Sequence, residues 1–353
     1  MAAFRTWVYT FSLAAIAVCL CSGRDVNAHV GTGIDLDRQG RIYFTDTYHN
    51  CIWRLESNGA LTPVLRGVHL DYLIVSEDGY VYVIKDGIWK ISPQGQMTEV
   101  LTSTQFPEGG KPLCIDRQAN IYFINSDAQL KHVPTISRRT LDGKVSLLAI
   151  GGGVQQQTQA IFGHINSAAW APDGSLYVRD YQIIRRVAPD GTISTLLHSE
   201  GAAMAEDGED SLVRTMGIAV DVAGNVYVAN YWKRAVMKVT SDGKVSTVAT
   251  AGWPWVSIGV AVSGNDIYVL ERMGNPYGPI TILEVSTLAD RLGSPRLRKI
   301  SPDGAITTLV VVKGDRGLAV IVVPLILVIL VVAALFVWLI RKTRSKRVLV
   351  TRS

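Results

Sequence analysis

The sequence predicts an all-β domain, a six-bladed β-propeller, followed by one C-terminal transmembrane α-helix. Two observations support this prediction. Two short sequence patterns each recur six times in the middle of the chain, between about residue 33 and residue 311. After them come 24 residues without a charge, 317–340, and then a basic tail.

The N-terminal residues 1–28 have the features of a secretory signal peptide. Arg5 supplies a short positive region, and a mostly apolar stretch over 7–21 follows it. Such a stretch is too short to be an ordinary membrane span. Small residues place the cleavage after Gly23 or after Ala28. The alternative is that the segment stays uncleaved as an anchor.

Six segments share the pattern of a short hairpin, in which two apolar strands flank a polar turn that ends in glycine. A glycine in that place supplies the positive φ that hairpin turns need. The segments are IWRLESNGAL at 52, IWKISPQGQM at 88, ISRRTLDGKV at 136, IRRVAPDGTI at 184, VMKVTSDGKV at 236 and LRKISPDGAI at 297. The turn glycines are Gly59, Gly95, Gly143, Gly191, Gly243 and Gly304.

A second pattern precedes each of these hairpins and carries a tyrosine at a fixed place. The tyrosines are Tyr43, Tyr82, Tyr122, Tyr177, Tyr227 and Tyr268. A position that recurs within one chain is expected to do the same packing work each time. We therefore expect the six tyrosines to be core residues rather than parts of a binding site.

The two patterns together predict repeats of two hairpins, or four antiparallel strands. A single four-stranded sheet leaves apolar faces in water, and a radial arrangement of such sheets covers them. The prediction is a six-bladed propeller over residues 29–311. The alternative is an open stack of sheets.

The repeats resemble the NHL-repeat family of six-bladed propellers. The best local matches are GIDLDRQGRIYFTDTYHN at 33–50 and GIAVDVAGNVYVAN at 217–230. More distantly, the chain is similar to propellers of the SMP-30/gluconolactonase kind. The resemblance implies NHL-like four-stranded blades. It leaves function open, because the fold serves both binding proteins and enzymes.

Residues 317–340, GLAVIVVPLILVILVVAALFVWLI, predict a transmembrane helix behind a short linker at 312–316. As a helix they are about 36 Å long, enough for a hydrocarbon core of about 30 Å. The tail 341–353 holds six basic residues and no acid. By the positive-inside rule the tail is cytoplasmic, which places the propeller outside, in the periplasmic or extracellular space.

The charge balance argues against a nucleic-acid partner. The chain has a formal charge of +5, and six positive charges belong to the tail. Residues 29–316 hold 27 basic and 29 acidic residues, so the domain itself is slightly acidic.

Cys51 and Cys114 fall in non-adjacent repeats, and we expect two buried free thiols.

Function is expected on one face of the propeller. The long connections are 150–164, 198–213 and 272–296. If the strands of a blade are named a to d from inside outward, the first two connections run d→a and the third b→c. All three therefore fall on one face, where binding loops are expected. The last strand also leaves the domain on this face. The face is therefore predicted to lie close to the bilayer.

Exposed aromatic side chains are expected on the same face and suit a protein, peptide or glycan partner. The candidates for the ligand-binding face are Tyr48, Tyr231, Trp232, Trp253, Trp255 and Tyr277. The alternative is that these side chains plug the central channel or cover the tops of the blades.

The resemblance to SMP-30/gluconolactonase propellers implies a metal site at the starts of the inner strands. Aligning the repeats places Asp71 and Asn166 there, and both offer oxygen ligands for Ca²⁺. Lys111 and Met216 stand at the same position in other repeats. A lysine charge and a thioether both disfavour a calcium site, so no cofactor is expected beyond this Ca²⁺ alternative.

No nucleophile with an assignable base is visible in the sequence. The leading hypothesis is therefore a non-catalytic, membrane-anchored binding module that uses its long-loop face. The alternative is a calcium-dependent lactonase or esterase-type hydrolase.

Overall fold

The structure is a computed structural model of the chain. It describes residues 33–47, 49–68, 70, 73–84, 87–102, 111–116, 118–127, 133–150, 162, 165–180, 183–198, 215–253, 255–273 and 295–312. The chain divides into two units, 1–30 and 31–353, and all the described residues belong to the second.

The described strands form six four-stranded antiparallel sheets, each built from four consecutive strands. Blade 1 holds β1 (Ile34–Leu36), β2 (Ile42–Asp46), β3 (Cys51–Leu55) and β4 (Leu61–Arg66); blade 2 holds β5 (Leu73–Val75), β6 (Val81–Ile84), β7 (Gly87–Ile91) and β8 (Met97–Thr102). Blade 3 holds β9 (Lys111–Ile115), β10 (Ile121–Asp127), β11 (Val133–Arg139) and β12 (Val145–Ile150); blade 4 holds β13 (Ile165–Trp170), β14 (Leu176–Asp180), β15 (Ile183–Val187) and β16 (Ile193–His198). Blade 5 holds β17 (Thr215–Val220), β18 (Val226–Asn230), β19 (Ala235–Val239) and β20 (Val245–Thr250); blade 6 holds β21 (Trp255–Ser263), β22 (Asp266–Met273), β23 (Arg296–Ile300) and β24 (Ile306–Val311).

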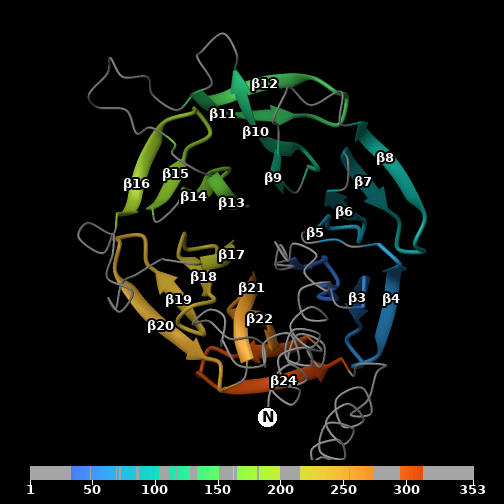
Figure 1. The fold of residues 1–353 in the computed structure, drawn as a ribbon. Helices are drawn as coiled ribbons and strands as arrows, with labels where there is room; N and C mark the ends of the chain where they lie inside the picture. Colours follow the sequence, from blue (N-terminus) through green and yellow to red (C-terminus); the bar gives the residue numbers. More distant parts are fainter. Residues whose placement is uncertain are drawn as a thin grey trace, which may run out of the picture. The chain divides into compact units, whose positions relative to one another are not determined.

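The six sheets stand around a central axis as the blades of a propeller (Figure 1). The inner strands contact one another in order, β1 with β5, β5 with β9, β9 with β13, β13 with β17 and β17 with β21. β21 also contacts β1, so the ring closes without an exchange of strands between the first and last blades. The predicted propeller is confirmed, and the alternative of an open stack is wrong.

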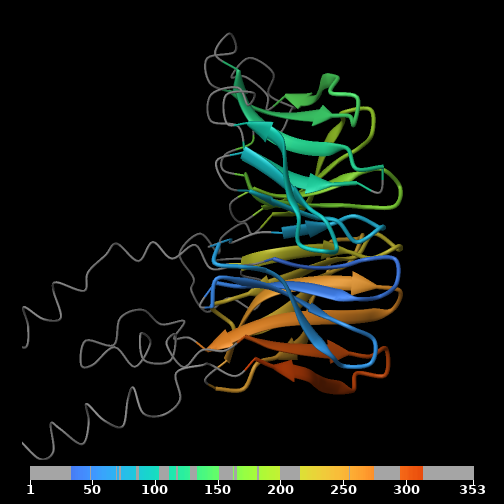
Figure 2. The same ribbon diagram turned by 90° about the vertical axis from the view of Figure 1, so that its right-hand side faces the viewer.

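Tight turns join strands a to b and c to d in every blade. In blade 1 the Asp37 amide donates to the Arg41 carbonyl at 3.2 Å, and the Gly40 amide donates to the Asp37 carbonyl at 3.0 Å. Gly40 has a φ of 73°, and all six glycines of the c→d turns also have positive φ. Figure 2 shows the blades edge-on, with these turns along one side of the disc. The predicted role of the turn glycines is confirmed.

The recurring tyrosines are core residues, as predicted. Five of the six are buried, and Tyr268 is half-buried. In blades 1, 3 and 5 the hydroxyl donates to an aspartate at the end of strand a, as Tyr43 does to Asp37 at 3.1 Å. Burial, with the Asp37 carboxylate close by, raises the pKa of Tyr43 to about 12. The hydroxyl therefore stays protonated and remains a donor.

Cys51 and Cys114 are free and buried, as predicted. Burial raises the pKa of Cys51 to about 12 and that of Cys114 further still. Both side chains are therefore neutral thiols within the sheets.

Several expectations fall outside the described residues. They are the signal peptide at 1–28, the span at 317–340, the tail at 341–353 and, apart from Val312, the linker at 312–316. Within the described part of the chain, no helix is long and apolar enough to cross a bilayer. The connections expected at 150–164, 198–213 and 272–296 are shorter than predicted, since Ile150, His198, Arg272, Met273 and Arg296 belong to strands.

Candidate functional site

The d→a and b→c connections meet on one face, which we call the long-loop face. In blade 5 the amide of Ala251, after strand d, donates to the carbonyl of Arg234 in the b→c turn at 2.6 Å. In blade 1 the Gly67 amide donates in the same way to the Asn50 carbonyl at 2.8 Å. The opposite face carries the a→b and c→d turns, and we call it the tight-turn face.

Aromatic and basic side chains gather where blades 5 and 6 meet on the long-loop face. We call this group the seam cluster: Tyr231, Arg234, Trp255, Glu271, Arg272, Arg296 and Arg298. The Arg296 guanidinium lies 4.3 Å from the centre of the Trp255 ring, and the Arg272 guanidinium lies 5.6 Å from that of Tyr231. Arg234 Nε donates to the Trp255 carbonyl at 2.9 Å, which ties blade 5 to blade 6.

A buried glutamate holds two of these arginines. The Glu271 side chain is fully buried, and Arg296 Nε donates to its Oε2 at 2.7 Å. Arg298 Nη2 donates to Glu271 Oε1 and also to the Thr250 carbonyl of blade 5, at 3.0 Å. A buried carboxylate with two charge-assisted donors is a strongly held arrangement.

The seam cluster has an excess of positive charge. It contains four guanidinium groups and one carboxylate. Within the described residues, the buried Arg234 Nη2 and Arg298 Nε have no hydrogen-bond acceptor. Buried donors are normally paired, and the surplus of guanidinium groups leaves the seam positively charged.

The residues expected on the ligand-binding face have different outcomes. Tyr231 and Trp255 belong to the seam cluster. Trp232, which follows Tyr231 in the sequence, is half-buried, and Trp253 is 78% exposed. The alternative, that these side chains plug the central channel or cover the tops of the blades, stays a prediction. Tyr48, Asp71 and Tyr277 lie outside the described residues. Asn166 is placed on β13, but its side chain lies outside them.

Blade 1 carries a histidine–aspartate pair on the long-loop face that the sequence patterns did not single out. His49 Nδ1 lies 2.6 Å from Asp46 Oδ2, and Trp53 Nε1 donates to the same oxygen at 3.0 Å. The Asp46 side chain is fully buried. It therefore orients a histidine and a tryptophan together at the end of strand b.

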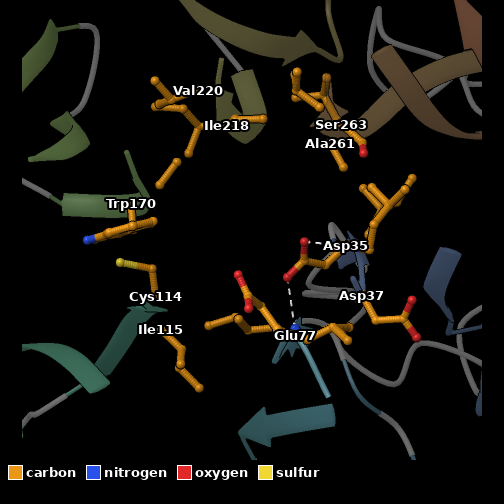
Figure 3. Close-up of a pocket in the computed structure, with 18 of the residues that line it drawn as sticks. Asp35, Asp37, Glu77, Cys114, Ile115, Trp170, Ile218, Val220, Ala261 and Ser263 are labelled. Carbon is orange, nitrogen blue, oxygen red and sulfur yellow. Dashed lines mark hydrogen bonds between the residues drawn. The ribbon is translucent and has the colours of Figure 1, made fainter. Parts of the chain in front are cut away.

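A central cavity of about 920 Å³ lies at the tight-turn end of the inner strands. All six inner strands and several a→b turns line it, and Figure 3 shows side chains from around the ring pointing toward it. Asp35 is the one acidic residue in this wall that lies on an inner strand, β1, because the other acids lie in the a→b turns. Its Oδ1 accepts from the Leu36 amide and its Oδ2 from the Val75 amide of β5, each at 2.8 Å.

Burial raises the pKa of Asp35 to about 6, against the opposing effect of its two backbone hydrogen bonds. A carboxyl group with such a pKa changes charge just below neutral pH. Sequence patterns missed this residue, because one aspartate in six copies of a variable position gives no recurring signal.

No metal-ligand cluster of three or more histidine, cysteine, aspartate or glutamate residues is present among the described residues. The calcium site expected at Asp71 and Asn166 stays a prediction, since neither side chain is described.

Comparisons with known proteins support the fold. The family model of the Teneurin NHL domain matches residues 151–208. No curated protein sequence matches the chain. A luciferin-regenerating enzyme has a similar structure, with a TM-score of 0.52 at 17% identity, and the match covers 82% of this chain and 94% of that one.

Two further similar structures come from bacteria. A calcium-binding regucalcin from Agrobacterium tumefaciens has a TM-score of 0.50 at 16% identity over 81% of this chain and 92% of its own. A gluconolactonase from Xanthomonas campestris has a TM-score of 0.48 at 14% identity over 67% and 81%. At these identities the likeness concerns the fold alone. The predicted resemblance to NHL-repeat propellers is confirmed by the family match over residues 151–208.

Proposed function

We propose that the protein is a membrane-anchored binding propeller whose long-loop face takes a protein, peptide or glycan partner. The seam cluster is the observation that carries this proposal. It brings two aromatic rings and four arginines together, and the exposed Trp253 follows β20 on the same face. Tryptophan, tyrosine and arginine are the side chains that dominate binding energies at interfaces.

The charge of the seam cluster favours an anionic partner. Four guanidinium groups face one carboxylate, and Arg296 and Arg298 are already held in place by Glu271. Because arginine presents a rigid fork of donors, a carboxylate, sulfate or phosphate group suits this seam better than a neutral one.

The location proposed for the protein follows from the two ends of the sequence. Residues 1–28 direct export, residues 317–340 span the membrane and residues 341–353 remain cytoplasmic. The end of β24 supports a bilayer-proximal long-loop face, because the Val312 amide donates to the Pro295 carbonyl beside Arg296. Residues 313–316 then reach at most about 14 Å to the proposed span.

The test is binding of three probes to the full chain in lipid nanodiscs: a sulfated heparin oligosaccharide, a polyglutamate peptide and neutral dextran. We expect an anionic probe to bind better than dextran, and more weakly at high salt. Trp253→Ala should weaken binding about 10-fold. Trp253 is exposed, so the fold should not depend on it.

The matched control is Lys244→Gln, which changes an exposed side chain on the tight-turn face. It should change affinity less than about 2-fold. Two results would exclude this face as an anion-binding surface. One is that dextran binds as tightly as the anionic probes, and the other is that Trp253→Ala and Lys244→Gln lose the same affinity.

The rival proposal is a calcium-dependent lactonase or esterase-type hydrolase with Asp71 and Asn166 as metal ligands. The supporting observation is their alignment at the starts of inner strands. Calcium-dependent lactone turnover by the full chain, lost in Asp71→Ala and Asn166→Ala, would establish it. Turnover that is absent with and without calcium would leave the binding proposal standing.

A further inference from the structure

The central cavity has the size and the position of a ligand site. Its volume of about 920 Å³ lies within the range of about 300–1,000 Å³ usual for small-molecule pockets. It opens among the a→b turns, on the tight-turn face, so it is separate from the seam cluster on the opposite face. An inference about it is therefore independent of the function proposed above.

Apolar side chains surround the cavity at the level where the inner strands end. The repeat position just before each a→b turn is apolar in all six blades and lines the cavity: Leu36, Val75, Ile115, Trp170, Val220 and Val262. Trp170 supplies the one aromatic ring of this set. Figure 3 shows Trp170 and Asp35 on opposite sides of the cavity.

One residue earlier on each inner strand, Asp35 is the only charged residue among the six equivalent positions. The same repeat position in the other blades is apolar or a thiol: Ile74, Cys114, Ala169, Ala219 and Ala261. Five seams of the ring therefore form without a carboxylate at this level. The propeller does not need an acid there, and even the partial burial of a carboxyl group opposes folding.

The cavity lining is electronegative. Its residues include five acids, Asp35, Asp37, Glu77, Asp116 and Asp221, and one arginine, Arg38. Asp37 pairs with Arg41 of its own turn at 2.5 Å, which leaves the other four acids against Arg38. A concave site lined by charges of one sign attracts ligands of the opposite sign. Asp35 also has acceptor capacity left, because each of its oxygens accepts one backbone hydrogen bond and a carboxylate has about four lone-pair sites.

We propose that this cavity binds an organic cation, in which a protonated amine pairs with Asp35 and an apolar, ring-bearing body packs against Trp170 and the aliphatic side chains of the wall. The amine replaces water at the remaining lone pairs of the Asp35 carboxylate. The indole of Trp170 offers a face to the ring or to the cation.

The proposal has a defined pH dependence. The pKa of Asp35 is raised to about 6 by burial, with a smaller contribution from Asp37. The carboxylate is therefore charged at neutral pH, and the attraction for a cation is lost as the pH falls through about 6. Cys114 stays neutral throughout, since burial raises its pKa. The other titratable or charged residues that line the cavity are Asp37, Arg38, Glu77, Asp116 and Asp221. Arg41 pairs with Asp37.

The experiment compares three probes with one indole body: tryptamine, which is cationic, tryptophol, which is neutral, and indole-3-acetate, which is anionic. Binding to the full chain in phosphatidylcholine nanodiscs is measured by calorimetry and saturation-transfer NMR, with empty discs subtracted. At pH 7.5 we expect tryptamine to bind at least about 10-fold more tightly than tryptophol, with indole-3-acetate weakest. Lowering the pH to 5 should remove the preference for tryptamine.

Asp35→Asn should reduce tryptamine affinity about 10-fold and leave tryptophol unchanged. The control is Asp142→Asn, an acid on the tight-turn face that does not line the cavity, and it should change neither. If Asp35→Asn fails to fold, the probe comparison and the pH series on the unaltered chain still decide. Equal binding of the three probes, absence of binding, or a preference for tryptamine that persists at pH 5 would overturn the proposal.

Discussion

Ala119 occupies a turn position that glycine holds in four other blades. The a→b turns of blades 1, 2, 4 and 5 place Gly40, Gly79, Gly174 and Gly224 at this position, all with positive φ. Ala119 has a φ of 58° in blade 3. For a residue with a Cβ atom, this conformation costs about 1–2 kcal/mol of free energy. Blade 3 is therefore locally strained at Ala119.

Replacing Ala119 with glycine should therefore raise the free energy of unfolding by about 1 kcal/mol, after the entropy that glycine loses on folding is subtracted. The measurement is denaturant unfolding of the full chain. The matched variant is Gly40→Ala in blade 1, which should lower stability by about 1 kcal/mol on the same balance of strain and entropy. A Cβ atom at Gly40 meets nothing within 4 Å, so its effect reports backbone conformation alone. Destabilisation by Ala119→Gly would contradict this account.

The role of a residue could be predicted where the same residue type recurs at the same position of every repeat. The six tyrosines and the turn glycines each appear once per repeat, and the structure places them as expected. Asp35 appears in one repeat of six, among Ile74, Cys114 and three alanines. Its importance arises from burial and from the Val75 amide of the next blade, 40 residues away, which no local pattern encodes.

At the scale of elements, the seams between blades depend on close approach of inner strands. A Cβ atom at Gly217 in β17 would lie 2.9 Å from Gly259 Cα and 3.0 Å from Val260 N in β21. Both neighbours are backbone atoms, which cannot move aside without shifting the strand. Glycine at 217 therefore sets the separation of blades 5 and 6.

Gly217→Ala should lower the free energy of unfolding by about 2 kcal/mol, within the range for overpacked interiors. The control is Gly252→Ala on the loop between the same blades, where a Cβ atom meets nothing within 4 Å. Thermal unfolding of both variants gives the comparison. A Gly217→Ala variant as stable as the Gly252→Ala variant would show that β17 and β21 are farther apart than described.

The strands could be predicted from the repeats, whereas the side-chain contacts between them could not. The acid at or near the end of strand b has a partner on strand c that differs between blades. Asp46 accepts from Trp53, Asp180 accepts from Arg185, and Glu271 accepts from Arg298. The stacking of Arg296 on Trp255 joins residues 41 positions apart, so the seam cluster emerged only from the fold.

At the scale of the whole molecule, the propeller separates two kinds of surface. The long-loop face carries the basic seam cluster and the exposed Trp253, and the tight-turn face carries an acidic central cavity. Both faces belong to a domain that is slightly acidic in sum. A net charge gives no hint of this division, because the division depends on which strand ends meet on which face.

The central claim is that partners bind the long-loop face. The most direct test replaces Trp253, or Lys244 on the opposite face, with the photo-crosslinking residue p-benzoylphenylalanine in the full chain in native membranes. Both side chains are exposed, so both variants should fold. Irradiation should give a covalent adduct of one defined mass from position 253 and none from position 244. Adducts from position 244, with none from position 253, would contradict the account.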